Sequence, residues 1–230
     1  MDELFFLVDR KTPDSSVELC GCVSRTTAHV LGFPHTTVLL LPATWDQPRN
    51  EPVVFVHKRS PVKRVSPNTW DFCGGHLSFD DWHCQYLRNS LNGSHLIERM
   101  AEDTAIREAN EELKCSPEFQ FAEKDIHRFK TVGYFDCNTK TDKSHNVEFS
   151  TAYVVTVPID TDVAVWDTDR EGERQLEVRG FSLAELAGEF ARSEESFADG
   201  AGRILRRIVD EPALMMELSE LLRTSTKPST

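Results

Sequence analysis

Short apolar runs along the chain are separated by charged or turn-forming stretches, which predicts a fold that mixes strands with helices. The β-branched runs Thr36–Leu41 and Pro52–His57 are expected to be buried strands. Further strands are predicted at Phe129–Cys137, Val147–Val157 and Leu176–Phe181.

Two weaker runs precede these strands, at Glu3–Asp9 and Val17–Val23, with a Pro-Asp turn signal between them. They predict a β-hairpin ahead of the main domain. We therefore divide the chain into an N-terminal β-hairpin extension at 1–33, a main domain with C-terminal helices at 34–223, and a flexible tail at 224–230.

One long helix is predicted by an apolar ridge in which every fourth residue is apolar. Ser94 is a suitable N-cap for it, and the ridge consists of Ile97, Ala101, Ala105, Ala109 and Leu113. Nearer the C-terminus, Ser182 and Glu185 form a capping-box pattern that predicts a helix through about Ala191. Two more helices are expected at Gly202–Val209 and Pro212–Leu222.

The long helix carries three carboxylates, Glu108, Glu111 and Glu112, which spacings of three and four place on one surface. Like charges at this spacing destabilise a helix by a few tenths of a kcal/mol. A hard divalent cation would offset that repulsion, because Mg²⁺ and Mn²⁺ prefer carboxylate oxygen. A solvated acidic helix face is the alternative.

The run from Arg107 to Glu112, with a predicted Gly74-Gly75 turn upstream, resembles the second half of the signature of the Nudix hydrolases, G-x5-E-x7-R-E-U-x-E-E-x-G-U. The resemblance spans roughly residues 34–190. It implies an α/β fold, an α/β/α sandwich with a mixed β-sheet. It also implies a metal-dependent hydrolase that cleaves a diphosphate bond in a nucleoside diphosphate linked to another group.

The first half of the signature departs from the family. Gly75 lies 32 positions before Arg107, so about 18 residues are inserted. Arg99 stands where the upstream glutamate belongs, and Lys114 where the closing glycine belongs. The insertion, about 78–93, is either a lid or specificity loop or a passive excursion.

The resemblance also implies roles for individual residues. Glu108, Glu111 and Glu112 would bind Mg²⁺ or Mn²⁺, with Glu108 and Glu112 also catalytic, and Arg107 would orient these carboxylates. Gly75 is assigned to the metal site, because the backbone of a glycine can approach a ligand closely.

Four residues outside the helix are further candidates. In this family a glutamate from a later strand often joins the metal site or activates water, and Glu148 is our candidate; an exposed strand carboxylate is the alternative. Lys58 and Arg59 belong to a basic cluster between a predicted core strand and the glycines, and are expected to bind phosphate unless they form a solvated loop. Arg25 could also reach a phosphate, although it equally fits a plain surface position.

Composition narrows the class of protein. The formal net charge of −12 argues against a protein that coats nucleic acid or an anionic membrane, and no apolar run is long enough for a membrane span. Six cysteines in 230 residues are more typical of reduced thiols in the cytoplasm than of a disulfide framework. The expected partner is a small nucleotide or another diphosphate substrate, and a homodimer stays open.

Two other interpretations remain. His29, His35, His76 and Glu148 would suit an isomerase similar to isopentenyl diphosphate isomerase, a relative that uses histidines in this region, although Gly74 stands where that enzyme has a catalytic cysteine. Whether the first two histidines bind metal is open. The departures within the signature would suit a non-catalytic, Nudix-like ligand-binding module.

Overall fold

The computed structural model describes residues 3–9, 18–63, 65–78, 93–116, 118–129, 134–140, 145–159, 161–169 and 172–225. Its strands are β1 (Leu4–Asp9), β2 (Glu18–Ser24), β3 (His35–Asp46), β4 (Glu51–Lys58), β5 (Trp70–Asp71), β6 (Cys73–His76), β7 (Leu113–Ser116), β8 (Ile126–Arg128), β9 (Tyr134–Lys140), β10 (His145–Thr156), β11 (Asp162–Asp169), β12 (Gly172–Gln175) and β13 (Val178–Ser182). Its α-helices are α1 (Arg25–Leu31), α3 (Gly93–Glu112), α4 (Leu183–Arg192), α5 (Asp199–Asp210) and α6 (Pro212–Ser225).

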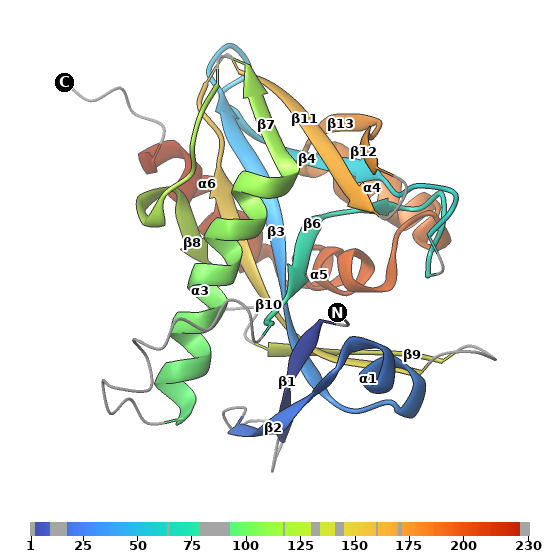
Figure 1. Ribbon diagram of the computed structural model, residues 1–230. Helices are drawn as coiled ribbons and strands as arrows, with labels where there is room; N and C mark the ends of the chain where they lie inside the picture. The colour runs from blue at the N-terminus through green and yellow to red at the C-terminus, as the bar shows by residue number, and fades with distance from the viewer. Residues whose placement is uncertain are drawn as a thin grey trace.

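Strand β3 is the centre of a large mixed sheet (Figure 1). On one side it pairs in parallel with β10, with His35 opposite Glu148 at the start of the ladder. On its other side it pairs antiparallel with β4, β6 and β1 in succession. The β1–β2 hairpin therefore joins the main sheet through Leu7, which pairs with His35.

Both faces of this sheet are covered, because the central strands are apolar at successive positions and neighbouring side chains point to opposite faces. Leu40 and Tyr153 pack on the side of α3, whereas Leu41 and Val154 pack against α4, α5 and α6. Figure 1 shows α3 in front of the sheet, with α5 and α6 behind it. The predicted α/β fold with a mixed sheet between helices is confirmed.

Local patterns predicted several elements well. The hairpin, the long helix and the three C-terminal helices are all present, and Ser182 caps α4 in a capping box with Glu185. The residues of the predicted apolar ridge are at most 2% exposed; four of them lie in α3, whereas Leu113 begins β7. The helix begins at Gly93, one residue before the predicted cap at Ser94.

Other elements differ from prediction. The expected glycine turn is wrong: Gly74 and Gly75 lie in β6, opposite Leu39 and Val38 of β3. Helix α1 and the small sheet of β7, β11 and β12 were not predicted. The strand expected at Phe129–Cys137 is described from Tyr134 onward, as β9, and its residues 130–133 lie outside the described residues. Most of the insertion (79–92) and the tail residues 226–230 lie outside the described residues.

Candidate active site

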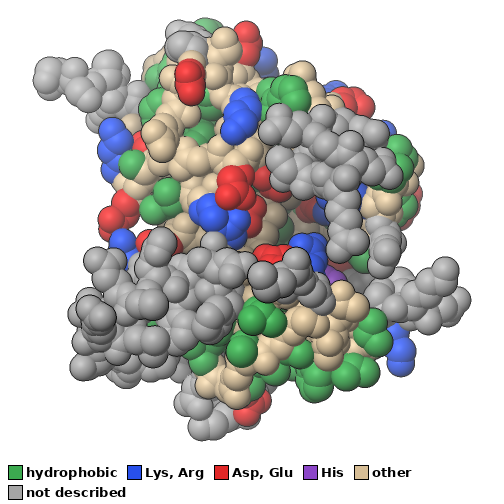
Figure 2. Space-filling view, in the orientation of Figure 1, with side chains coloured by type: hydrophobic (Ala, Val, Ile, Leu, Met, Phe, Trp, Pro, Cys, Tyr) green, Lys and Arg blue, Asp and Glu red, His purple; other side chains and the backbone are tan. Residues whose placement is uncertain are grey.

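The acidic surface of α3 faces β6 because the opposite side of the helix is fixed in the core. Ala101, Ala105 and Ala109 are completely buried, and their small side chains allow the helix to lie close to the sheet. This packing places the carboxylates near the end of α3 beside the glycine strand. Figure 2 shows acidic and basic side chains gathered at the centre of this face of the molecule.

Glu108 occupies the space that a side chain at Gly75 would need. A Cβ atom at position 75 would lie 1.9 Å from Oε1 of Glu108, so only glycine permits this contact. Glu108 is 8% exposed, and burial raises the pKa of its carboxyl, although the nearby Arg107 guanidinium partly opposes that effect. The structure thus holds a buried carboxylate against the backbone of β6.

Glu112 is held by the neighbouring glycine. The backbone N–H of Gly74 donates a hydrogen bond to Oε2 of Glu112, at 3.1 Å. Gly74 also lies tightly against β3, because a Cβ atom there would be 2.2 Å from the carbonyl oxygen of Val38. Two successive glycines of one short strand therefore position two carboxylates of α3.

Arg107 links the third carboxylate to this arrangement. Its guanidinium lies 2.9 Å from Oε1 of Glu108 and 2.9 Å from Oε2 of Glu111, and it donates to the carbonyl oxygen of His76 at 3.4 Å. Glu111 is the most exposed of the three, with about half of its side chain accessible. Arg107 therefore contacts two of the three carboxylates, and its orienting role stays a prediction.

The predicted phosphate-binding residues make other contacts. Arg59 forms an ion pair of 2.6 Å with the buried Asp71, and the ammonium of Lys58 lies over the ring of Trp70, 5.3 Å from its centroid. Arg25, at the start of α1, pairs with Glu3 at 2.9 Å. The described contacts do not connect these three cations to the carboxylates of α3.

Glu148 belongs to a second group of side chains, the four residues that suggested the isomerase interpretation. It lies with His29, His35 and His76, and one ligand atom from each of the four residues falls within 4.8 Å of all the others. The register explains the meeting: Glu148 is opposite His35, and His76 is opposite Thr37, two residues further along the same face of β3. Helix α1 contributes His29.

The electrostatics of this second group are strongly perturbed. Burial lowers the pKa of His35 to about 4, with the neighbouring His76 acting in the same direction. Burial alone would raise the pKa of Glu148, but the His76 imidazole, the Asn146 amide and the His35 imidazole together lower it to about 2. At neutral pH, His35 is therefore neutral and Glu148 is ionised.

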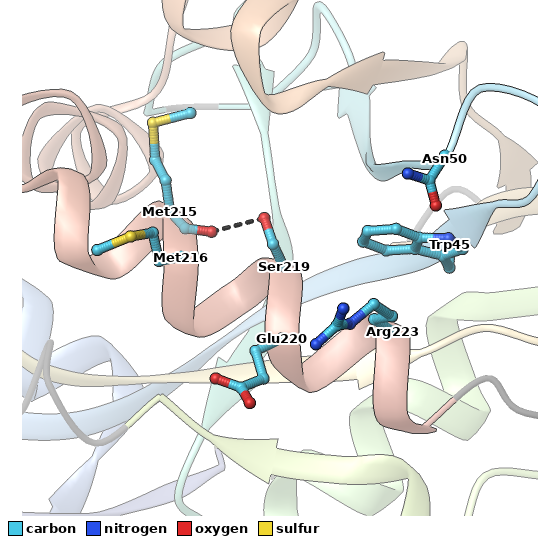
Figure 3. Close-up of a pocket in the computed structure, with 7 residues that line it drawn as sticks. All are labelled: Trp45, Asn50, Met215, Met216, Ser219, Glu220 and Arg223. Carbon is cyan, nitrogen blue, oxygen red and sulfur yellow. Dashed lines mark hydrogen bonds between the residues drawn. The ribbon is translucent and has the colours of Figure 1, made fainter.

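A separate hollow lies on the other side of the sheet, between α6 and the turn that follows β3 (Figure 3). Trp45 and Asn50 line it opposite Met215 and Arg223, and the Ser219 hydroxyl donates to the carbonyl of Met215 at 2.7 Å. α6 packs in the core cluster of the sheet face opposite α3. This hollow is therefore separate from the carboxylates of α3, and Trp45 lies at the opposite end of β3 from His35 of the histidine group.

Comparisons with known proteins were made at three levels. No family model matches the chain, and no curated protein does. Solved structures do match. A Nudix hydrolase from Alicyclobacillus acidocaldarius is 12% identical, with 79% of this chain and 95% of that one covered and a TM-score of 0.49. A MutT protein from Methanosarcina mazei is 14% identical over 78% and 95% of the two chains, with a TM-score of 0.41.

An Ap4A hydrolase from C. elegans is 10% identical over 77% of this chain and 97% of that one, with a TM-score of 0.42. The three solved structures are thus a Nudix hydrolase, a MutT protein and an Ap4A hydrolase, and these matches assign no function to this chain. Among the described helices, none combines the length and the apolar character that crossing a membrane requires.

Proposed function

We propose that this chain is a metal-dependent hydrolase of the Nudix type, which cleaves a diphosphate bond in a nucleoside diphosphate linked to another group. One observation carries the proposal: Glu108 and Glu112 are held against the successive glycines of β6, while Arg107 bridges Glu108 and Glu111. A solvated acidic face would not explain why the structure reserves backbone space for a carboxylate.

The residues fit Mg²⁺ or Mn²⁺. The three glutamates offer oxygen ligands, which both ions prefer. Burial disfavours the charged form of Glu108, and a divalent cation would compensate for that cost. When bound, such an ion neutralises charge on the phosphate oxygens and lowers the pKa of a water molecule.

The chain's own residues prepare the site. Arg107 keeps Glu108 and Glu111 from separating, because it pairs with both. The N–H of Gly74 fixes the direction of the Glu112 carboxylate. We do not assign the activation of water to Glu148, since a carboxylate with a pKa of about 2 is a weak general base at neutral pH, and its described contacts are with the histidines and Asn146 instead of with the α3 carboxylates.

The substrate would approach as a small-molecule nucleotide or another diphosphate. Lys58, Arg59 and Arg25 remain our candidates for its phosphates, and each would exchange a present partner for a phosphate oxygen. The cytoplasm and the absence of nucleic-acid and membrane partners also stay predictions, based on composition and cysteine usage.

Phosphate release from nucleoside triphosphates, dinucleoside polyphosphates, nucleotide sugars and NADH would test the proposal, with Mg²⁺ or Mn²⁺ in each assay. We expect metal-dependent turnover that Glu112→Gln abolishes. Glu102→Gln is the matched control, because Glu102 lies on the same helix and pairs with Arg99 instead of β6. Equal turnover by wild type and Glu112→Gln would refute the assignment of the glutamates.

The isomerase interpretation has one observation in its favour, because the histidines that suggested it do lie together with Glu148. Formation of dimethylallyl diphosphate from isopentenyl diphosphate would support it. If neither reaction occurs but calorimetry detects nucleotide binding, the chain is the non-catalytic binding module.

A further inference from the structure

Four side chains with metal-binding atoms converge where α1, β3, β6 and β10 meet. Oε1 of Glu148 lies 3.9 Å from Nε2 of His35 and 3.5 Å from Nε2 of His76, and a ligand atom of His29 completes a group within 4.8 Å. Ligands of a tetrahedral ion with bonds of about 2.1 Å are about 3.4 Å apart. Small side-chain adjustments would therefore suffice to enclose an ion.

Contacts behind the ligand atoms orient two of these side chains. Nδ1 of His35 lies 2.8 Å from the carbonyl oxygen of Phe33, and because a carbonyl only accepts, Nδ1 carries the proton in the neutral ring. The unprotonated Nε2 then faces the group. The Asn146 amide donates to Glu148 at 2.6 Å. Hydrogen bonds from residues outside the ligand set usually orient metal ligands in this way.

Two ring nitrogens of the group face the Glu148 carboxylate at ion-pair distance but are buried without a hydrogen bond. Nε2 of His35 and Nε2 of His76 are buried and make no hydrogen bond within the described part of the chain. Phe5, itself fully buried, stacks on His76 with ring centroids 4.2 Å apart and on His35 at 5.0 Å. Burying unpaired imidazole nitrogens beside an aromatic ring is costly, unless something binds them.

We propose that His29, His35, His76 and Glu148 bind a first-row transition-metal ion of the Zn²⁺ type. Three imidazole nitrogens with one carboxylate favour such an ion, whereas the all-oxygen set on α3 favours Mg²⁺ or Mn²⁺. The proposal goes beyond the hydrolase function and does not depend on it.

The structure keeps the two sets of ligands separate but adjacent. Gly75 borders the carboxylate of Glu108, and the next residue, His76, directs its ring into the histidine group. The carbonyl of His76 also accepts a hydrogen bond from Arg107. β6 thus contributes to both sets, and each set can be tested by a variant that leaves the other intact.

Binding of Co²⁺ to chelator-treated, full-length protein would test the proposal, because protein-bound Co²⁺ has a visible absorption that reports imidazole ligation without any substrate. We expect one equivalent to bind to wild type and Zn²⁺ to displace it. His29→Gln and Glu148→Gln should each weaken binding by about 100-fold or more, since losing even an outer-shell partner costs 10–100-fold.

His127→Gln is the matched control, since His127 lies on β8 outside the four-residue group. His127→Gln and Glu112→Gln should both bind Co²⁺ as wild type does. Mn²⁺ binding, measured by electron paramagnetic resonance, should be lost in Glu112→Gln and retained in His29→Gln. Thermal unfolding of each variant verifies that it is folded. No Co²⁺ absorption in wild type, unchanged affinity in His29→Gln, or loss of Co²⁺ in Glu112→Gln would each overturn the proposal.

Discussion

Replacing Gly75 by alanine should move the carboxylate of Glu108 without unfolding the protein. The new Cβ atom would lie 1.9 Å from Oε1 and 2.2 Å from Cδ of Glu108, and ordinary contact begins near 3.4 Å. The carboxylate must therefore move by about 1.5 Å. It is the end of a flexible side chain, so it can move while β6 keeps its pairing with β3.

A displacement of this size is large for a reacting centre. Misplacing a group by about 1 Å can reduce the rate by roughly 100-fold, so we expect Gly75→Ala to lose at least about 100-fold in metal-dependent phosphate release. Affinity for Mn²⁺ should fall as well, because Glu108 is a proposed ligand. The assay is steady-state turnover with Mn²⁺, beside a thermal unfolding curve.

Gly188→Ala is the control, because Gly188 lies within α4 and a Cβ atom there meets nothing closer than 3.8 Å. It should retain full turnover and gain about 0.5–1 kcal/mol of stability from better helix propensity. Wild-type turnover in Gly75→Ala would refute the argument that this glycine exists for Glu108. Unfolding of that variant would refute the argument that only the carboxylate moves.

Three further predictions concern stability. Glu108→Gln should abolish turnover without destabilising metal-free protein in urea unfolding at pH 7, because burial already disfavours the charged carboxyl; marked destabilisation would contradict this. The pKa of His35 is about 4 in the folded protein and about 6.5 in the unfolded chain. As the pH falls, His35 is therefore protonated in the unfolded chain before it is protonated in the folded protein, which favours unfolding. Metal-free protein should therefore lose up to roughly 3 kcal/mol as the pH falls from 6.5 to 4, and His35→Gln should show a flatter profile in the same urea titrations. Ser182→Ala should cost about 1 kcal/mol through the lost cap of α4 and leave turnover unchanged; a halved turnover would show that α4 supports the site.

Sequence patterns predicted the structural features that depend only on residues close together in the chain. The ridge from Ile97 to Leu113 and the capping box at Ser182 are local signals, and the structure contains both helices. The same holds for the three glutamates of α3, whose common surface follows from helix geometry. Gly74 and Gly75 were placed correctly near the glutamates but assigned to a turn, because glycine signals close approach as well as reversal.

The histidine group depends on pairing between distant strands, which no local pattern encodes. His35 meets Glu148 only because β10 lies parallel to β3 in one particular register. A shift by one residue would have pointed Glu148 to the opposite face. The resemblance to the isomerase suggested these four residues as one set, but their distances follow only from the three-dimensional arrangement. The same reason explains why the small sheet of β7 and β11 was missed.

The shortness of β6 has a consequence for how this protein tolerates insertions and deletions. Four consecutive residues, Cys73–His76, serve a carboxylate on one side and an imidazole group on the other. Removing one residue after Asp71 would exchange the two sides of the strand, so both sets of ligands would be lost in a single event. Lineages of this protein should therefore hardly vary in length between Asp71 and His76.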